Sequence, residues 1–155
     1  MKRGDARELA VHLVYGRVFT GEEPQQVVST RLDKEYYEKL ADEHEVYMER
    51  PSRPQLRYID TVVTGIANRE EELNAVISQF SIGWDITRIS KLARCILQLA
   101  IYEIQFVEDV PTGVAISEAV RIAKKYDGNE AGSFVNGILG SYARSLTAPA
   151  TEEVK

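Results

Sequence analysis

The chain has 155 residues, with 19 basic and 24 acidic side chains and a formal net charge of −5. A chain of this length buries roughly 68–70% of its unfolded surface, which suffices for one domain or for two small subdomains sharing a core. The acidic balance excludes a strongly basic nucleic-acid binder, although it leaves room for a local basic patch.

The number of cysteines and the hydropathy of the sequence indicate the cellular compartment in which the protein is found. The single cysteine, Cys95, can form no internal disulfide and lies in the apolar stretch CILQLAIY, where a small buried residue fits. The first apolar stretch is interrupted by His12, and no segment approaches the ~20 apolar residues of a membrane span. We therefore expect a cytoplasmic protein without a membrane segment, in which Cys95 fills the core.

The N-terminal segment combines basic charge with a helical pattern. Residues 1–21 carry four basic and two acidic side chains, whereas residues 22–50 carry four basic and nine acidic ones. Asp5 followed by Glu8 predicts a capping box that opens the first helix. Apolar residues then recur at the spacing of a core-facing stripe. This stripe consists of Ala6, Leu9, Ala10, Leu13 and Val14.

Two further helices are predicted before the middle of the chain. The first covers residues 24–42. Residues 44–54 include two prolines and continue no apolar period, which predicts a connector. Ser52 and Gln55 then form another capping-box pattern. Apolar residues at alternating steps of three and four predict one long helix that ends near residue 80.

The second half of the chain predicts three more helices. Ser90 is placed to cap a helix over residues 91–106, which is apolar nearly all round and therefore central. Helices over residues 112–126 and 130–146 follow, separated by an Asp-Gly-Asn turn. The sequence thus predicts an all-α domain of about six or seven helices over residues 1–146. A flexible C-terminal tail is expected over residues 147–155.

Residues suited to metal binding or catalysis are scarce. His12, His44 and Cys95 are the only nitrogen or sulfur ligands, and they do not have the spacing of a zinc site, which needs about four ligands. No pair of carboxylates is placed in an apolar pocket where acid–base chemistry is favoured. We therefore expect no metal, no cofactor and no enzymatic activity.

Glycines cluster in the segment GNEAGSFVNGILG near the C-terminus. A phosphate-binding loop is excluded there, because no strand precedes the segment and no Gly-Lys-Ser/Thr ends it. Gly137 and Gly140 would each cost about 1 kcal/mol inside a helix. Close approach of another helix is the expected compensation for that cost.

A second stripe on the first helix is basic at its start and apolar at its end. Arg3, Arg7, Val11 and Tyr15 recur every four residues, and Val18 follows three residues later. One interpretation is a solvated arginine end on a helix packed on two sides. The other is a composite surface on which arginines contact phosphates and the apolar residues contact a protein partner.

Four segments resemble the NusB family of bacterial transcription antitermination factors. They are ARELAVHLVY, ILQLAIYEI, VPTGVAISEAVRIAKKY and FVNGIL, in that order, between Ala6 and Ala143. The resemblance implies an all-helical, non-catalytic protein of two small helical subdomains. It implies pairing with NusE, a small-subunit ribosomal protein, and binding of boxA-type single-stranded RNA in support of ribosomal RNA operons. Other antitermination factors and RNA polymerase are then indirect partners.

The resemblance also implies site residues. Those for RNA are Lys2, Arg3, Arg7, Glu130 and Phe134. Those for NusE are Val11, Tyr15 and Val18, of which Tyr15 matches an aromatic position of the family and the valines come from the second stripe. Phe134 fits a core anchor equally well, because it begins the apolar pattern of the last helix.

The sequence leaves two alternative functions to consider. Gly4 and Asp5 stand where arginines are common in the family, so the chain fits a protein-interaction adaptor with weak or lost RNA binding. NusB-like domains are also found fused to ribosomal RNA cytosine methyltransferases. A methyltransferase of that kind requires a cofactor-binding domain after the helical domain. We expect instead a NusB-like domain that is not fused to a methyltransferase.

Overall fold

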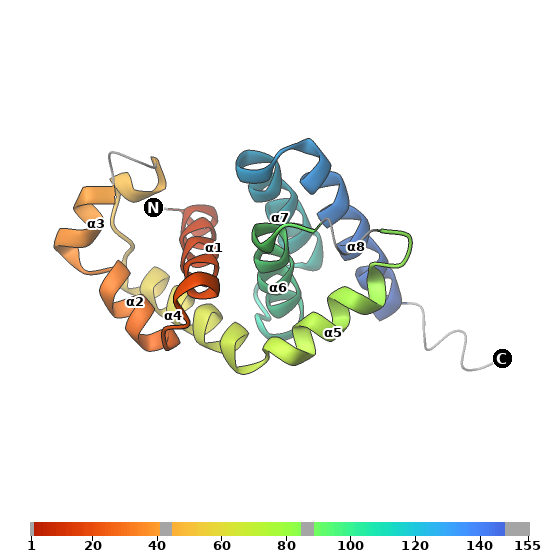
Figure 1. The fold of residues 1–155 in the computed structure, drawn as a ribbon, viewed down its shortest axis with the longest axis horizontal. Helices are drawn as coiled ribbons and strands as arrows, with labels where there is room; N and C mark the ends of the chain where they lie inside the picture. Colours follow the sequence, from red (N-terminus) through yellow and green to blue (C-terminus); the bar gives the residue numbers. More distant parts are fainter. Residues whose placement is uncertain (1, 41–44, 85–88, 148–155) are drawn as a thin grey trace. The chain divides into compact units, whose positions relative to one another are not determined.

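The computed structural model describes residues 2–40, 45–84 and 89–147. Of the tail expected over residues 147–155, Thr147 is the last residue of a helix, and the other residues lie outside these ranges. Over the described residues the chain is all-helical, which confirms the predicted class (Figure 1). The elements are α1 (Arg3–Thr20), α2 (Pro24–Arg31), α3 (Lys34–Leu40), the 3-10 helix η1 (Glu45–Met48), α4 (Arg53–Asn68), α5 (Glu70–Phe80), α6 (Lys91–Phe106), α7 (Thr112–Asp127) and α8 (Asn129–Thr147).

The chain divides into two compact helical units. Unit 1 covers Met1–Asn68 and contains α1 to α4 with η1, whereas unit 2 covers Arg69–Lys155 and contains α5 to α8. Of the helices described, none combines the length and the apolarity that a membrane crossing requires.

In unit 1, α1 packs against α4, α2 and η1. It begins at Arg3, earlier than predicted, because Asp5 occupies the third helical position instead of the cap. Its carboxylate accepts a hydrogen bond of 3.3 Å from the backbone N–H of Lys2. Gly21 ends the helix in the left-handed conformation with φ 68°, and its N–H donates to the carbonyl of Arg17.

The connector after α3 contains an anchored 3-10 turn that its sequence did not predict. The buried Tyr37 hydroxyl donates to the carbonyls of Val46 at 3.2 Å and Glu49 at 2.6 Å. The Tyr37 and Tyr47 rings meet edge to face at 5.2 Å, and the Tyr47 hydroxyl hydrogen-bonds His12 Nδ1 on α1 at 3.0 Å. Burial raises the pKa of Tyr37 well above its usual value. These contacts fasten η1 to α3 and α1.

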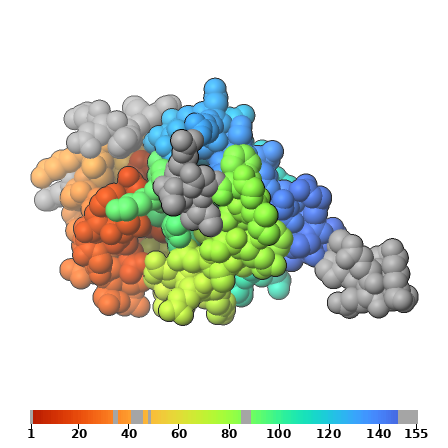
Figure 2. Space-filling view, turned by 45° about the vertical axis from the view of Figure 1, so that its right-hand side comes forward, coloured from red at the N-terminus to blue at the C-terminus, as the bar shows by residue number. Residues whose placement is uncertain are grey.

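In unit 2, α6 is the central helix and packs against α5, α7 and α8. Ser90 caps it as predicted, accepting a hydrogen bond of 2.9 Å from the N–H of Ala93. Cys95 is 1% exposed, and burial raises the pKa of its thiol to about 12, which agrees with the expected core position. In the space-filling view of Figure 2, the side chains of α5 and α8 lie next to one another, as their packing contacts require.

Two of the predicted helices are each divided in two, so the described residues form more helices than the six or seven expected. The long helix expected to end near residue 80 is interrupted at Arg69, whose φ of −121° and ψ of 22° are not helical. The Arg69 guanidinium lies 4.2 Å from the centre of the Phe106 ring, and three glutamates open the next helix, a position that favours acidic residues. The helix expected over residues 24–42 is interrupted at Asp33, whose carbonyl accepts the N–H of Tyr37.

The glycines of α8 have a different cause from the expected helix–helix approach. A Cβ at Gly137 would lie 2.9 Å from the indole of Trp84, so the glycine makes room for a side chain. A Cβ at Gly140 would meet only the Arg144 side chain of the same helix, at 3.4 Å. The close approach between helices occurs instead at Gly132, where a Cβ would lie 2.5 Å from Lys124 Cγ on α7.

Candidate nucleic-acid and partner surfaces

The basic start of α1 is gathered around one tyrosine of α4. The guanidinium carbon of Arg3 lies 4.5 Å from the centre of the Tyr58 ring, and that of Arg7 lies 6.0 Å from it. Such stacking holds a guanidinium by attraction to the ring and orients its N–H edge. Lys2 and Arg3 are exposed, whereas Arg7 is only 3% exposed.

The second stripe of α1 is therefore not a continuous exposed surface. Val11 is fully buried, and Arg7 is nearly so, which corrects the expectation of a composite face through all five positions. The physical reason is that α1 is covered by three neighbouring elements of its own unit, α4, α2 and η1. At Arg7 and Val11, α1 is packed on two sides, which was one of the two interpretations of the stripe. Only the two ends of the stripe are exposed.

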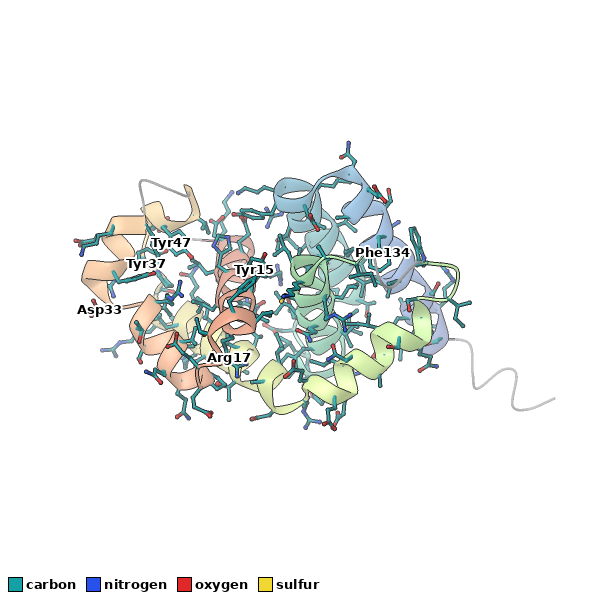
Figure 3. All side chains as sticks on the ribbon, in the orientation of Figure 1. Tyr15, Arg17, Asp33, Tyr37, Tyr47 and Phe134 are labelled. Carbon is teal, nitrogen blue, oxygen red and sulfur yellow. The ribbon has the colours of Figure 1, made fainter. Side chains whose placement is uncertain are left out.

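The C-terminal end of α1 carries the exposed apolar residues. Val18 is 47% exposed and Phe19 is 62% exposed, while Tyr15 is half-buried. The rings of Tyr15 and Phe19 meet edge to face at 5.0 Å. We call Tyr15, Val18 and Phe19 the α1-end surface; Figure 3 labels Tyr15 on this helix. Sequence reasoning missed Phe19, although it follows Tyr15 at the same four-residue spacing that selected the stripe.

Two arginines border the α1-end surface. The Nε–H of Arg17 donates to the carbonyl of Glu22 at 2.7 Å, which fastens the turn after α1. The guanidinium of Arg31 on α2 lies 5.4 Å from the centre of the Tyr36 ring. It lies beside Gly16 of α1, where a Cβ would be at an ordinary contact distance of 3.7 Å from the Arg31 Nη2 atom. The surface is therefore aromatic at its centre and cationic at its edge.

Unit 2 contains a cavity of about 310 Å³ next to the start of α8. Its lining comes from the segment after α5, the start of α6, the end of α7 and the first turns of α8. The lining residues are Gly83, Trp84, Ile89, Ser90, Ala93, Asp127, Glu130, Ala131 and Phe134. The structure thus brings together Glu130 and Phe134, the two residues of α8 that the family resemblance implied.

Two perpendicular aromatic rings form one wall of this cavity. Trp84 and Phe134 have ring centres 5.0 Å apart and an angle of 88° between their planes. Phe134 is 8% exposed and lies within unit 2 on α8 (Figure 3), whereas Trp84 is 40% exposed. Of the two possibilities for Phe134, burial favours the core position, and the accessible aromatic face belongs to Trp84.

Carboxylates form the polar side of the cavity. The Ser90 hydroxyl donates to Asp127 Oδ2 at 2.5 Å, which links the start of α6 to the end of α7. Glu130 is exposed in the first turn of α8, where the helix dipole stabilises a negative charge. Sequence reasoning missed Trp84 and Asp127 as cavity residues. The available signal was Trp84 itself, which is the only tryptophan of the chain and follows a turn glycine.

The fold and these surfaces define an all-helical protein of two small units that exposes aromatic and charged residues at helix ends. A family model described as the NusB family matches residues 4–144. The chain belongs to the NusB family.

Relatives of known name support this membership. A protein of Acetivibrio thermocellus, named transcription antitermination protein NusB, is 38% identical over 144 residues, covering 93% of this chain and 90% of that protein. The protein of the same name from Agathobacter rectalis is 42% identical over 109 residues, covering 70% of this chain and 80% of that protein.

Solved structures show the same fold. T. maritima NusB aligns with a TM-score of 0.76 and 27% identity, over 100% of this chain and 99% of that chain. A crystal structure of the antitermination factors NusB and NusE in complex with dsRNA aligns with a TM-score of 0.71, over 92% of this chain and 96% of that chain. Its identity of 23% makes it a comparison of fold alone.

Proposed function

We propose that the chain is a transcription antitermination factor that binds boxA-type single-stranded RNA together with NusE and supports transcription of ribosomal RNA operons. The observation that carries this proposal is the family match over residues 4–144. The protein acts by binding, without catalysis, in the cytoplasm. Other antitermination factors and RNA polymerase are its indirect partners.

RNA binding is assigned to the basic start of α1 and to the cavity region of unit 2. Lys2 and Arg3 contact phosphates, and stacking on Tyr58 orients the Arg3 guanidinium for such a contact. Arg7, which is nearly buried, supports the same tyrosine. Glu130 and Phe134 contribute at the cavity, where unpaired bases are the groups that aromatic side chains recognise.

NusE binding is assigned to the α1-end surface. Exposed aromatic residues at the centre of a patch are the residues that most often dominate protein–protein affinity. Tyr15 and Val18 contact the partner directly, together with Phe19, which is the most exposed of the three. Val11, being buried, supports Tyr15 from within the helix packing.

A second candidate function is a protein-interaction adaptor with weak or lost RNA binding. The observation that favours it is the burial of Arg7, which leaves Lys2 and Arg3 as the exposed cations before α1 proceeds into its packed region. Because phosphate contacts supply most nonspecific RNA affinity, so short an arm binds RNA weakly alone.

Filter binding to a boxA RNA, with and without NusE, tests the proposal and separates it from the adaptor. The proposed function predicts weak, salt-sensitive binding by the chain alone and tighter binding with NusE. A scrambled RNA of the same composition is the control. Binding of NusE without any effect on RNA retention would favour the adaptor, and retention of neither partner would reject both functions.

A further inference from the structure

We propose that Arg31 on α2, stacked on Tyr36 of α3, forms an anion-binding edge of the α1-end surface and binds a carboxylate of the protein partner that docks there. This inference rests on the NusE binding proposed above and adds the chemistry that the partner presents at one point of the contact. Arg31 is suited to this role by its stacking, by its place beside the α1-end surface and by the charge around it.

The Arg31 guanidinium is held where three helices of unit 1 meet. Its central carbon lies 5.4 Å from the centre of the Tyr36 ring, in the first turn of α3. Its Nη2 atom lies beside Gly16 of α1, and the side chain as a whole is half-buried. An aromatic ring attracts a guanidinium and leaves its outward N–H groups available as donors. Because the guanidinium is already oriented, less side-chain freedom is lost when an anion binds to it.

The donors of Arg31 have no carboxylate partner, unlike those of two arginines in unit 2. Arg69 pairs with Glu72 at 3.2 Å, and Arg121 pairs with Glu118 at 2.6 Å. Within residues 2–40, 45–84 and 89–147, no carboxylate forms an ion pair with Arg31. A half-buried guanidinium has lost part of its hydration, and a carboxylate can replace that water through two parallel hydrogen bonds. Arg31 is therefore prepared to accept an anion from outside the chain.

Arg31 is continuous with the α1-end surface of Tyr15, Val18 and Phe19. Gly16, beside which the guanidinium lies, directly follows Tyr15 on α1, and α1 packs against α2. A partner that covers the exposed Val18 and Phe19 side chains also excludes water from the adjoining guanidinium. Charge-assisted hydrogen bonds are stronger where water is excluded. The apolar contact and the carboxylate contact thus reinforce one another.

The charge around Arg31 favours a single carboxylate over an RNA backbone. Residues 22–50 carry four basic and nine acidic side chains, and Glu23, Asp33 and Glu38 are exposed. These acidic side chains repel a strand that carries one phosphate per nucleotide. One carboxylate bound to Arg31 is attracted at contact distance, where the pair outweighs more distant charges that salt screens. The occupant is therefore an Asp or Glu side chain of the protein partner.

Titration calorimetry of the full chain with NusE tests the proposal. Arg31→Gln should weaken the affinity about tenfold, because the charge-assisted hydrogen bonds are lost. Raising the salt concentration from about 0.05 M to about 0.3 M should weaken binding by the unaltered chain more than binding by Arg31→Gln, because screening acts on the charge pair. Arg31→Lys, which retains the charge but not the planar fork, should recover part of the affinity.

Two further sets of variants separate the site from a general effect of charge. Arg53→Gln removes the same charge at the exposed start of α4 and should leave the NusE affinity unchanged. Tyr36→Phe keeps the ring and should also bind normally, whereas Tyr36→Ala removes the stacking and should weaken binding about threefold. Melts followed by circular dichroism should show that each variant remains folded, because Arg31 and Tyr36 both keep contact with solvent.

A double-mutant cycle identifies the carboxylate of the partner. NusE variants that each replace one surface Asp or Glu by its amide are titrated with the unaltered chain and with Arg31→Gln. One of these NusE variants should lose about tenfold in affinity for the unaltered chain and lose nothing further with Arg31→Gln.

The possible failures are distinguishable. NusE affinity and salt dependence that do not change in Arg31→Gln would overturn the anion-binding edge and leave the proposed function intact. Equal losses in Arg31→Gln and Arg53→Gln would also overturn it, because they would show an effect of net charge alone. Weaker retention of boxA RNA by Arg31→Gln in the absence of NusE would show that Arg31 binds a phosphate instead. Absence of NusE binding by the unaltered chain would overturn the proposed partner and this inference with it.

Discussion

The two units present their aromatic residues in opposite ways. On the α1-end surface of unit 1, the side chains of Val18 and Phe19 are about half exposed or more and lie open to solvent. In unit 2, Phe134 is 8% exposed and forms the wall of a cavity with Trp84. An exposed aromatic patch suits a protein partner that covers it, whereas a walled cavity suits a small flat group. The two units therefore differ in how accessible their aromatic side chains are.

The comparison also shows that the position of an aromatic residue in a helix does not decide its role. Phe19 and Phe134 are both helical phenylalanines next to another ring, Tyr15 and Trp84 respectively. Their exposed fractions of 62% and 8% come from what packs around them. The largest expected mutational effect therefore concerns the free energy of unfolding at Phe134.

Phe134→Ala is expected to lower the free energy of unfolding by about 3–5 kcal/mol, because it leaves a void in the wall of unit 2. The matched change Phe19→Ala should alter it by less than about 0.5 kcal/mol, because that ring is mostly in solvent. Urea denaturation followed by circular dichroism measures both. Equal losses in the two variants would remove the distinction between a buried and an exposed aromatic.

Tyr15→Asp is expected to weaken NusE binding at least about thirtyfold, which corresponds to roughly 2 kcal/mol for an aromatic anchor. RNA binding by the isolated chain should persist, because Lys2 and Arg3 lie several turns away on α1. Isothermal titration calorimetry with NusE gives the affinity, and Gln25→Asp on the exposed side of α2 is the control. An unfolded Tyr15→Asp chain would identify Tyr15 as core, and unchanged affinity would place the partner elsewhere.

Tyr37→Phe should lower the free energy of unfolding by about 1–3 kcal/mol, because the buried hydroxyl donates to the carbonyls of Val46 and Glu49. The same substitution in unit 2, Tyr142→Phe, removes a hydroxyl that accepts from the exposed Gln105 amide at 2.8 Å. It should cost about 1 kcal/mol or less, because the amide can turn to water. Thermal melts of both variants show whether η1 depends on Tyr37.

Arg3→Ala is expected to have the smallest effect. With Arg7 buried, Lys2 and Arg3 provide about two phosphate contacts, and the arm alone should give a log–log salt slope near −1.4. Removing Arg3 should reduce that slope by about 0.7 without changing the melting temperature. RNA titrations across a series of salt concentrations measure it. A slope that does not change would exclude Arg3 from phosphate contact.

Local sequence patterns determined the helices and most of their ends. Ser90 caps α6 as its spacing requires, and α7 and α8 begin and end within one residue of the predicted bounds. The apolar stripe of α1 and the nearly continuous apolar surface of α6 are buried as predicted. These features follow from the sequence because caps and periodicity act between residues a few positions apart. The family resemblance likewise came from short motifs in a fixed order.

Contacts between residues far apart in the chain decided the rest. At the interruption the Arg69 guanidinium contacts the ring of Phe106, and beside η1 the carbonyl of Glu49 accepts the Tyr37 hydroxyl. Val11 is buried because several elements cover α1. The spacing of apolar residues along a helix does not show how many elements will pack against it. The cavity exists because Trp84 and Phe134, fifty positions apart in the chain, pack at right angles. Packing of this kind depends on side-chain shape in three dimensions, which no local pattern encodes.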